Sequence, residues 1–139
     1  MRIDHTIESF YEYTAGKALS KFLLGLRSGK ILGGRCGRCG QAAIPPRAYC
    51  INCYSPDMAY YEMDAPAYVA TYTVSNLSLD GGRWDRPVTW VFVKYSDVAG
   101  GLLHILADGV EPYIGLRVKP VFRSDRIGSI WDIMFFTHI

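Results

Sequence analysis

The sequence contains no apolar run that approaches the ~20 residues needed to span a lipid bilayer. Its first residues, Met1–His5, are polar and carry no apolar segment of the kind found in export signals. These two absences predict a protein that is not embedded in a membrane. They also predict a cytoplasmic location, where thiols stay reduced and available to metal ions.

Motifs of independent catalysis are also missing. The chain has no Gly-x-Ser-x-Gly elbow, no P-loop and no dinucleotide-binding fingerprint, and its acidic residues show no pairing suited to acid–base chemistry. Of the three histidines, His5 and His138 lie near the ends. His104 lies in an apolar segment, where a hydrogen-bonded structural role is expected. The sequence therefore predicts no enzymatic activity of its own.

A strong net charge is absent as well. The formal net charge is only +2, which argues against a dedicated nucleic-acid-binding protein. The charge is unevenly spread, because no acidic residue occurs between Glu12 and Asp57. Seven basic residues fall in that interval: Lys17, Lys21, Arg27, Lys30, Arg35, Arg38 and Arg47. Two interpretations remain open, a solvated basic face or a surface that attracts phosphate groups.

What the sequence does contain is four cysteines in two pairs, and the members of each pair are separated by two residues. This gap lets both sulfurs of one tight turn point at a single metal ion. Two such turns complete a tetrahedral thiolate site with Zn–S distances near ~2.3 Å. No other cysteine is present in the chain. The pattern predicts one structural zinc ion bound by Cys36, Cys39, Cys50 and Cys53.

Other uses of these cysteines are less consistent with the sequence. Iron fits the same four sulfurs, because ligand softness and geometry do not exclude it. A redox dithiol needs a stabilised thiolate, usually at the start of a helix, and Pro45-Pro46 after Cys39 oppose a long helix there. Structural disulfides would suit a secreted protein, which the polar N-terminus does not indicate. Zinc remains the favoured metal.

Two helical segments are expected before the cysteines. Residues from about Thr6 to Tyr13 can form a short helix. The second helix is marked by apolar residues at helical spacing: Leu19, Phe22, Leu23 and Leu26. Gly29 is placed to end this second helix.

Turn-forming residues then divide the chain. Gly33-Gly34, Gly40 and Pro45-Pro46 surround the cysteine pairs and predict a rubredoxin-like zinc ribbon. Such a module is too small to bury a core of its own and relies on the metal for folding. We expect an N-terminal helical segment over residues 1–29, the zinc ribbon over residues 30–62 and a β-barrel over residues 63–139.

Five β-strands are expected in the barrel, because short segments rich in β-branched and aromatic residues are separated by turn signals. Their approximate bounds are Ala67–Ser75, Val88–Tyr95, Leu102–Ala107, Leu116–Arg123 and Ile130–Thr137. Five short strands without a long helix fit the OB-fold, a Greek-key barrel, better than a β-sandwich. The predicted fold class is therefore mainly β: N-terminal helices, a rubredoxin-like zinc ribbon and a five-stranded OB-fold barrel.

Two of these strands are apolar on both faces. Both alternating sets of Val88–Tyr95 are largely apolar, and Leu102–Ala107 has His104 as its only polar residue. A strand that faces water on one side should be polar on that side. We therefore expect the outside of the barrel to be covered, either by the N-terminal helices or by a partner subunit.

Several motifs of the chain occur together in one known family. They are Gly29-Lys30-Ile31, Arg35 to Gly40, Pro45-Pro46-Arg47 with Cys50 and Cys53, and Ile114 to Val118 with Phe122. From about Ala18 to Phe136 the chain thus resembles the acyl-CoA-associated zinc-ribbon/OB-fold proteins, long known as a domain of unknown function. Pro45-Pro46-Arg47 is the most specific element. The end departs from the family, because Phe135-Phe136-Thr137-His138 replaces a Phe-x-Pro-like segment.

The resemblance implies a non-catalytic scaffold that bridges thiolase-like and hydroxymethylglutaryl-CoA synthase-like enzymes and helps to hold the coenzyme A part of an acyl-CoA. Lys30, Arg35 and Arg47 border the metal module and become candidates for its phosphate oxygens. Trp84, expected in a loop, becomes a candidate for stacking on a base or for anchoring a partner; the equal alternative is that it folds back onto the barrel. The alternative is a single-stranded nucleic-acid-binding module, because OB-folds and zinc ribbons also serve that purpose.

Overall fold

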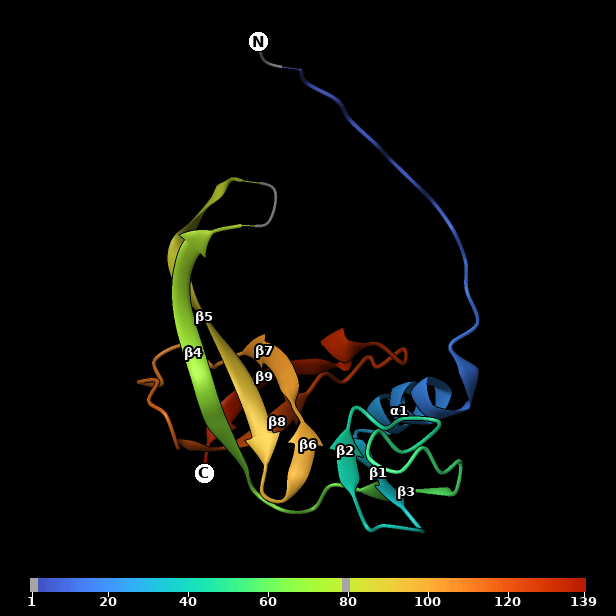
Figure 1. Cartoon of the computed structure of the whole chain (residues 1–139). Helices are drawn as coiled ribbons and strands as arrows, with labels where there is room; N and C mark the ends of the chain where they lie inside the picture. Colours follow the sequence, from blue (N-terminus) through green and yellow to red (C-terminus); the bar gives the residue numbers. More distant parts are fainter. Residues whose placement is uncertain (1–2, 79–80) are drawn as a thin grey trace.

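The computed structural model describes residues 3–78 and 81–139. Residues 1–2 of the expected N-terminal segment and residues 79–80 of the expected barrel lie outside the described residues. Figure 1 shows a helix and a small sheet beside a larger, curved sheet with a long hairpin. The elements are α1 (Gly16–Arg27), β1 (Leu32–Cys36), β2 (Ala42–Ile44), β3 (Met58–Glu62), β4 (Ala67–Leu77), β5 (Arg83–Tyr95), β6 (Val98–Gly100), β7 (Leu102–Ile105), β8 (Arg117–Phe122), the 3-10 helix η1 (Ile130–Asp132) and β9 (Ile133–His138).

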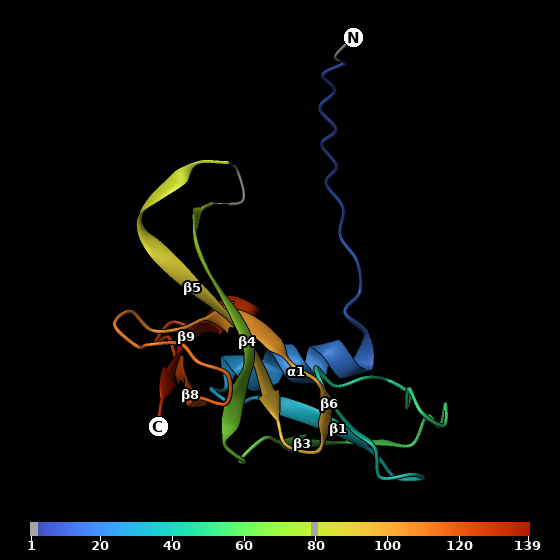
Figure 2. The same cartoon turned by 60° about the vertical axis from the view of Figure 1, so that its left-hand side comes forward.

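The segment before α1 has no regular secondary structure from Ile3 onward, so the predicted helix over Thr6–Tyr13 is wrong. Figures 1 and 2 both show this segment extended away from the rest of the molecule. Its large apolar side chains are exposed to solvent, and Phe10 is 94% exposed. A helix this short is marginal in water without packing, so the local helical pattern is not sufficient.

The second predicted helix is confirmed as α1. Phe22 and Leu26 are buried on the apolar stripe, and Leu19 and Leu23 pack against the core from its edge. The helix ends where Gly29 was expected to end it. The N–H of Gly29 donates to the carbonyl oxygen of Leu26, and the N–H of Lys30 donates to the carbonyl oxygen of Gly25, each at 2.9 Å. This pattern satisfies two of the last carbonyls of the helix.

The zinc ribbon forms a small sheet with the strand order β3-β1-β2-β6. β1 pairs antiparallel with β2 and with β3, as expected for two cysteine-bearing turns joined by short extended pieces. The fourth strand, β6, follows β5 in the sequence and pairs in parallel with β2. The β2–β6 pair therefore attaches the ribbon to the barrel through backbone hydrogen bonds.

The barrel strands follow the order β7-β5-β4-β8-β9. A parallel bridge between Leu106 and Phe136 joins the two outer strands, and the N–H of Ala107 donates to the carbonyl of Phe136 at 2.8 Å. This closure produces the predicted five-stranded OB-fold. Two predicted bounds differ by three residues or more: β5 begins earlier, at Arg83, and the first residues of the predicted last strand form η1.

One hydrophobic core connects α1, the ribbon and the barrel. It includes Leu26 of α1, Ile44 of β2, Val93 of β5 and Phe136 of β9, which are at most 2% exposed. α1 packs mainly on β1 and η1 and leaves the outer face of β7 open, so Leu103 is 62% exposed. The prediction that the N-terminal helices cover the outside of the barrel is therefore wrong. Among the described residues, no helix is both long and apolar enough to cross a lipid bilayer.

Candidate metal centre and an aromatic pocket

The four cysteines meet at one point of the ribbon. Cys36 ends β1 and Cys39 lies in the turn after it, and the loop between β2 and β3 carries Cys50 and Cys53. Their sulfurs all lie within 4.8 Å of one another, with 3.6 Å between Cys36 and Cys53 and 3.5 Å between Cys39 and Cys50. A tetrahedral zinc site with Zn–S near ~2.3 Å requires sulfurs about 3.8 Å apart. The arrangement therefore has the size of a four-thiolate metal site.

The two cysteine turns have matching backbone hydrogen bonds. The N–H of Gly40 donates to the carbonyl of Cys36, and the N–H of Tyr54 donates to the carbonyl of Cys50, each at 3.0 Å. Asn52 donates its backbone N–H to the sulfur of Cys50 at 3.4 Å and its side-chain amide to the sulfur of Cys39 at 3.7 Å. Such N–H donors stabilise thiolates and orient metal ligands.

Backbone hydrogen bonds, burial and the neighbouring thiols shift the pKa values of Cys39 and Cys53 in opposite directions. The backbone at Gln41, followed by the Cys50 thiol, lowers the pKa of Cys39 to about 6. The backbone at Ser55 lowers the pKa of Cys53, but burial and the three neighbouring thiols outweigh it and raise the pKa to about 11. Four negative sulfurs this close repel one another unless a cation lies between them. The donor set therefore fits a divalent metal ion that prefers sulfur.

The three predicted phosphate-binding residues lie on the ribbon, but they are not equally available. Lys30 forms an exposed ion pair with Glu62 at 2.7 Å. Arg35 donates to the carbonyl of Gly40 at 3.1 Å, and its guanidinium lies 5.4 Å from the ring centroid of Tyr61. The exposed side chain of Arg47 forms no hydrogen bond or ion pair within residues 3–78 and 81–139. Arg47 is therefore the most available of the three.

Trp84 is not part of that group. It lies on β5 rather than in the predicted loop, and Figures 1 and 2 show the outer part of the β4–β5 hairpin well away from the ribbon. There it lines a pocket of about 590 Å³, here called the aromatic pocket. The residues of the aromatic pocket are Thr73, Ser75, Leu77, Trp84, Trp90, Leu103, His104, Ile130 and Trp131.

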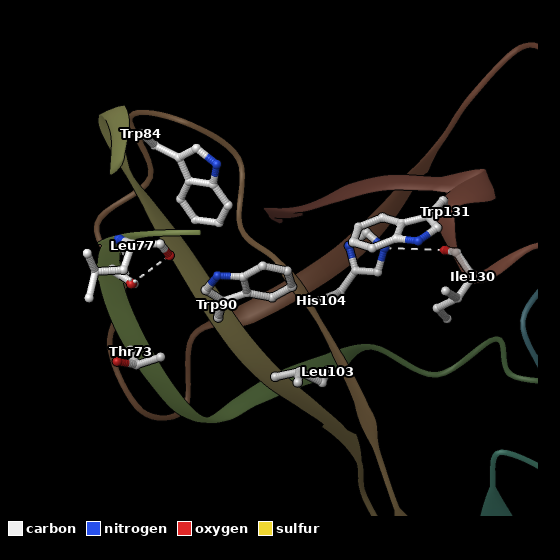
Figure 3. Close-up of a pocket in the computed structure, with 9 residues that line it drawn as sticks. Thr73, Leu77, Trp84, Trp90, Leu103, His104, Ile130 and Trp131 are labelled. Atoms are coloured by element: carbon white, nitrogen blue, oxygen red, sulfur yellow. Dashed lines mark hydrogen bonds between the residues drawn. The ribbon is translucent and has the colours of Figure 1, made fainter. Parts of the chain in front are cut away.

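The aromatic pocket collects every tryptophan of the chain, which sequence analysis did not foresee. Trp84 and Trp90 have ring centroids 6.5 Å apart, and Trp90 and Trp131 are also 6.5 Å apart. Figure 3 shows Trp90 between Trp84 and Trp131, with the His104 ring next to Trp131. The sequence held one signal for this pocket: all three tryptophans fall within the residues predicted to form the barrel.

His104 lies against Trp131 and is 1% exposed. Its Nε2 lies 3.3 Å from the carbonyl oxygen of Ile130, which bears out a hydrogen-bonded structural histidine. Its Nδ1 is buried and has no hydrogen-bond partner in the described part of the chain. Burial lowers the pKa of His104, although the backbone at Ile130 and Ile105 opposes this shift, so the ring is neutral near pH 7.

Asp132 fixes the loop that carries Trp131. Its carboxylate is 2% exposed and accepts backbone N–H groups from Ile127 at 3.0 Å, Gly128 at 2.7 Å and Ser129 at 3.1 Å. Burial alone would raise the pKa of Asp132, but the three donors hold this pKa below its usual value. The charged carboxylate is therefore part of the folded structure of this loop.

We expect Asp132→Asn to destabilise the protein by about 1–3 kcal/mol, because an amide keeps one acceptor oxygen and leaves a buried N–H unpaired. Urea unfolding measures this loss, with the exposed Asp125→Asn as a control that should stay within about 0.5 kcal/mol of wild type. The pKa of Asp132 is lowered in the folded state. Its contribution to the free energy of unfolding is therefore full above the ordinary carboxyl pKa of about 3.9 and is lost as the pH falls below that value. Equal stability of both variants at neutral pH would contradict this role.

Comparison with known proteins agrees with this architecture. Residues 25–59 match the family model of the ChsH2 rubredoxin-like zinc ribbon domain. A crystal structure of a DUF35-family protein of unknown function from Sulfolobus solfataricus is 29% identical and covers 93% of this chain and 90% of its own, with a TM-score of 0.70. A structure described as Ltp2-ChsH2(DUF35) aldolase is 18% identical and covers 91% of this chain and 98% of its own, with a TM-score of 0.66. No curated protein sequence matches the chain significantly.

These comparisons confirm the resemblance inferred from the cysteine and Pro-Pro-Arg motifs. The family model spans the two cysteine pairs and the first two ribbon strands, β1 and β2, and the Sulfolobus protein extends the similarity over nearly the whole chain. The more distant structure supports the fold alone, because its sequence identity is only 18%. The chain is thus similar to DUF35 proteins, with a rubredoxin-like zinc ribbon followed by an OB-fold.

Proposed function

We propose that this protein is a non-catalytic, zinc-containing scaffold subunit that binds acyl-CoA and bridges thiolase-like enzymes. The observation that carries the proposal is the fold shared over 91% of the chain with a structure described as Ltp2-ChsH2(DUF35) aldolase, in which the name joins a DUF35 chain to an aldolase. A protein of the same architecture is suited to the same kind of assembly. In this proposal the protein works in the cytoplasm, where its thiols stay reduced.

Exposed apolar surface supports a partner. Large side chains of the N-terminal segment are open to solvent, including Ile7 at 80% and Tyr11 at 77%. The β4–β5 hairpin also exposes Val74 and Leu77, at 53% and 56%. Two separate apolar segments of this kind are unusual on a monomer and typical of protein–protein contacts. The second alternative expected from the sequence was that a partner subunit covers the outside of the barrel. We propose that this partner is an enzyme subunit.

In the proposed assembly, zinc is structural. Cys36, Cys39, Cys50 and Cys53 would fill all four positions of the metal, which leaves none for water or substrate. A closed site supplies folding energy and no catalysis. The proposed role of the metal is to hold the cysteine turns, and with them the basic residues of the ribbon, in a fixed position.

The proposed acyl-CoA contact centres on Arg47. Phosphates of coenzyme A are recognised well by the planar guanidinium group of arginine. Arg47 is exposed and unpaired among the described residues, whereas Lys30 and Arg35 already have partners on the ribbon. We propose that Arg47 makes the first phosphate contact and that the other two adjust to support it.

The partner is tested by affinity purification of the tagged protein from its native host, with identification of the proteins recovered. We expect a thiolase-like or synthase-like enzyme in stoichiometric amount. Acetyl-CoA titrated into the purified complex should then bind about tenfold more weakly in the Arg47→Ala variant. Arg38→Ala, an exposed arginine of the same ribbon, serves as the control. Repeated recovery without any acyl-CoA enzyme would contradict the bridging role.

A single-stranded nucleic-acid-binding module is the second candidate, and the aromatic pocket is the observation in its favour. Base stacking on aromatic side chains is the usual mode of such proteins, together with a basic groove that follows the phosphates. The residues that line the aromatic pocket include no lysine or arginine, so the described structure lacks that groove at the aromatic face. A salt-dependent titration with single-stranded DNA separates the two functions.

A further inference from the structure

We propose that the aromatic pocket is a binding site for a neutral, flat ring compound that carries one O–H or N–H donor. The proposal does not rest on acyl-CoA binding, because none of Lys30, Arg35 and Arg47 lines this pocket. It concerns a second site, lined by residues of β4, β5, β7 and η1, with a chemistry different from that of the ribbon.

The position of the pocket is the first argument. β5 and β7 are the second and third strands of the barrel, and Trp131 lies in the connection between its fourth and fifth strands, β8 and β9. OB-folds bind oligonucleotides and oligosaccharides on the face of the second and third strands, between the loops that flank it. The volume of about 590 Å³ lies within the ~300–1,000 Å³ typical of small-molecule sites.

The side chains that line the pocket determine which ligand shape and charge it can bind. Three indole rings and the side chains of Leu77 and Leu103 form a largely apolar surface, and Trp131 remains 49% exposed. Burial of these faces by a flat ring is favourable both through the hydrophobic effect and through aromatic contacts. No aspartate, glutamate, lysine or arginine is among the lining residues, so the described pocket offers no opposite charge to a charged ligand.

His104 defines the polar group of the ligand. Its Nε2 faces the carbonyl of Ile130, which only accepts, so Nε2 carries the proton and Nδ1 of the neutral ring is an acceptor. Figure 3 shows Nδ1 on the side of the ring turned away from Ile130 and toward Trp90. This buried acceptor has no donor among the described residues, and an unpaired buried acceptor is costly. A ligand O–H or N–H would satisfy it.

Access to Nδ1 requires a shift of Trp131. The indole of Trp131 lies against His104, with ring centroids 5.4 Å apart and an interplanar angle of 61°. Because Trp131 is half exposed, it is the part of the wall that can move without opening the core. The largest spectroscopic change on binding is therefore expected at the Trp131 indole.

The test uses two probes, indole and N-methylindole, titrated into the full-length, nitrogen-labelled protein near neutral pH. The three tryptophan indole N–H signals report on this pocket alone, because the chain has no other tryptophan. We expect saturable shifts with a Kd for indole of about 1 mM or tighter. N-methylindole keeps the ring and lacks the donor, so it should bind about tenfold more weakly.

Two variants assign the contacts. His104→Phe keeps an aromatic ring without the acceptor. It should reduce the ratio of the Kd for N-methylindole to the Kd for indole to about one. A merely structural role of His104 would not change this ratio. Trp84→Ala, on the projecting hairpin, should weaken both probes by about tenfold. Tyr113→Ala removes an exposed aromatic residue outside the pocket and should change neither.

Three outcomes would overturn the proposal. The first is an absence of saturable shifts at the indole N–H signals at several times the expected Kd. The second is equal affinity for the two probes in the wild-type protein, which would exclude the acceptor role of His104. The third is a response only to single-stranded DNA, with a steep salt dependence, which would assign the face to nucleic acid instead.

Discussion

Replacing Cys36 by serine is expected to release the metal and to unfold the cysteine turns while the barrel stays folded. Elemental analysis should fall from about one zinc ion per chain to a small fraction of that value. Hydrogen exchange of the amides of Gly40 and Tyr54, which close the two turns, should accelerate by about 100-fold or more. Amides at the centre of the β4–β5 pair should keep their protection.

The reason for this local response lies in how the ribbon is supported. Ile31, Ala42 and Ile44 at its base belong to the common hydrophobic core, whereas Cys36 and Cys50 are buried outside that cluster. The base of the ribbon is therefore held by packing, and its cysteine end is held by little other than the metal. Small metal-bound modules of this kind unfold when the ion is removed.

Arg38→Ala is the matched control for the metal site, because Arg38 lies between the first two cysteines and is exposed. It should keep both the zinc content and the slow amide exchange. Iron instead of zinc in the wild-type protein would correct the identity of the metal and leave the folding argument intact. Wild-type protein that contains no metal, with four thiols that react freely in the folded state, would refute the site altogether.

Features written in short stretches of sequence were predictable. The two cysteine pairs, the apolar stripe of α1 and its end at Gly29 each depend on neighbouring residues, so local spacing was enough. The barrel strands were found for the same reason, since alternation and turn residues are local signals. Thr6–Tyr13 shows the limit of that reasoning, because a helical pattern without a packing partner does not produce a helix.

The aromatic pocket and the parallel β2–β6 pair could not be predicted in the same way. Trp84 and Trp90 on β5 meet Trp131 only because the β8–β9 connection folds back along the barrel. Likewise, Val98–Gly100 pairs with a strand more than fifty residues earlier, and three residues carry no periodicity that indicates it. Both features depend on contacts between distant segments, which a sequence pattern does not encode directly.

The β2–β6 pair leads to the second large expected effect, at Gly100. This residue ends β6 with a φ of +83°, and the N–H of Gly101 donates to the carbonyl of Ile44 at 3.0 Å. A Cβ at position 100 would collide with the carbonyl oxygen of Ile44. The Cβ position is fixed by the backbone of residue 100 and the atom it meets is a backbone oxygen, so no side-chain rotation can relieve the collision. Any larger residue must therefore separate β6 from β2.

We expect Gly100→Ala to destabilise the protein by about 3 kcal/mol or more, from a positive φ together with a lost junction hydrogen bond. Gly109→Ala is the matched control, because Gly109 has a φ of +79° but open space around its Cβ position, so only the backbone cost of about 1–2 kcal/mol applies. Urea unfolding with unchanged m values compares the two variants. Since both carry the same left-handed strain, the difference between them measures the contact with Ile44. Equal losses would mean that the ribbon and the barrel are not joined through this strand pair, and that the common core alone holds them together.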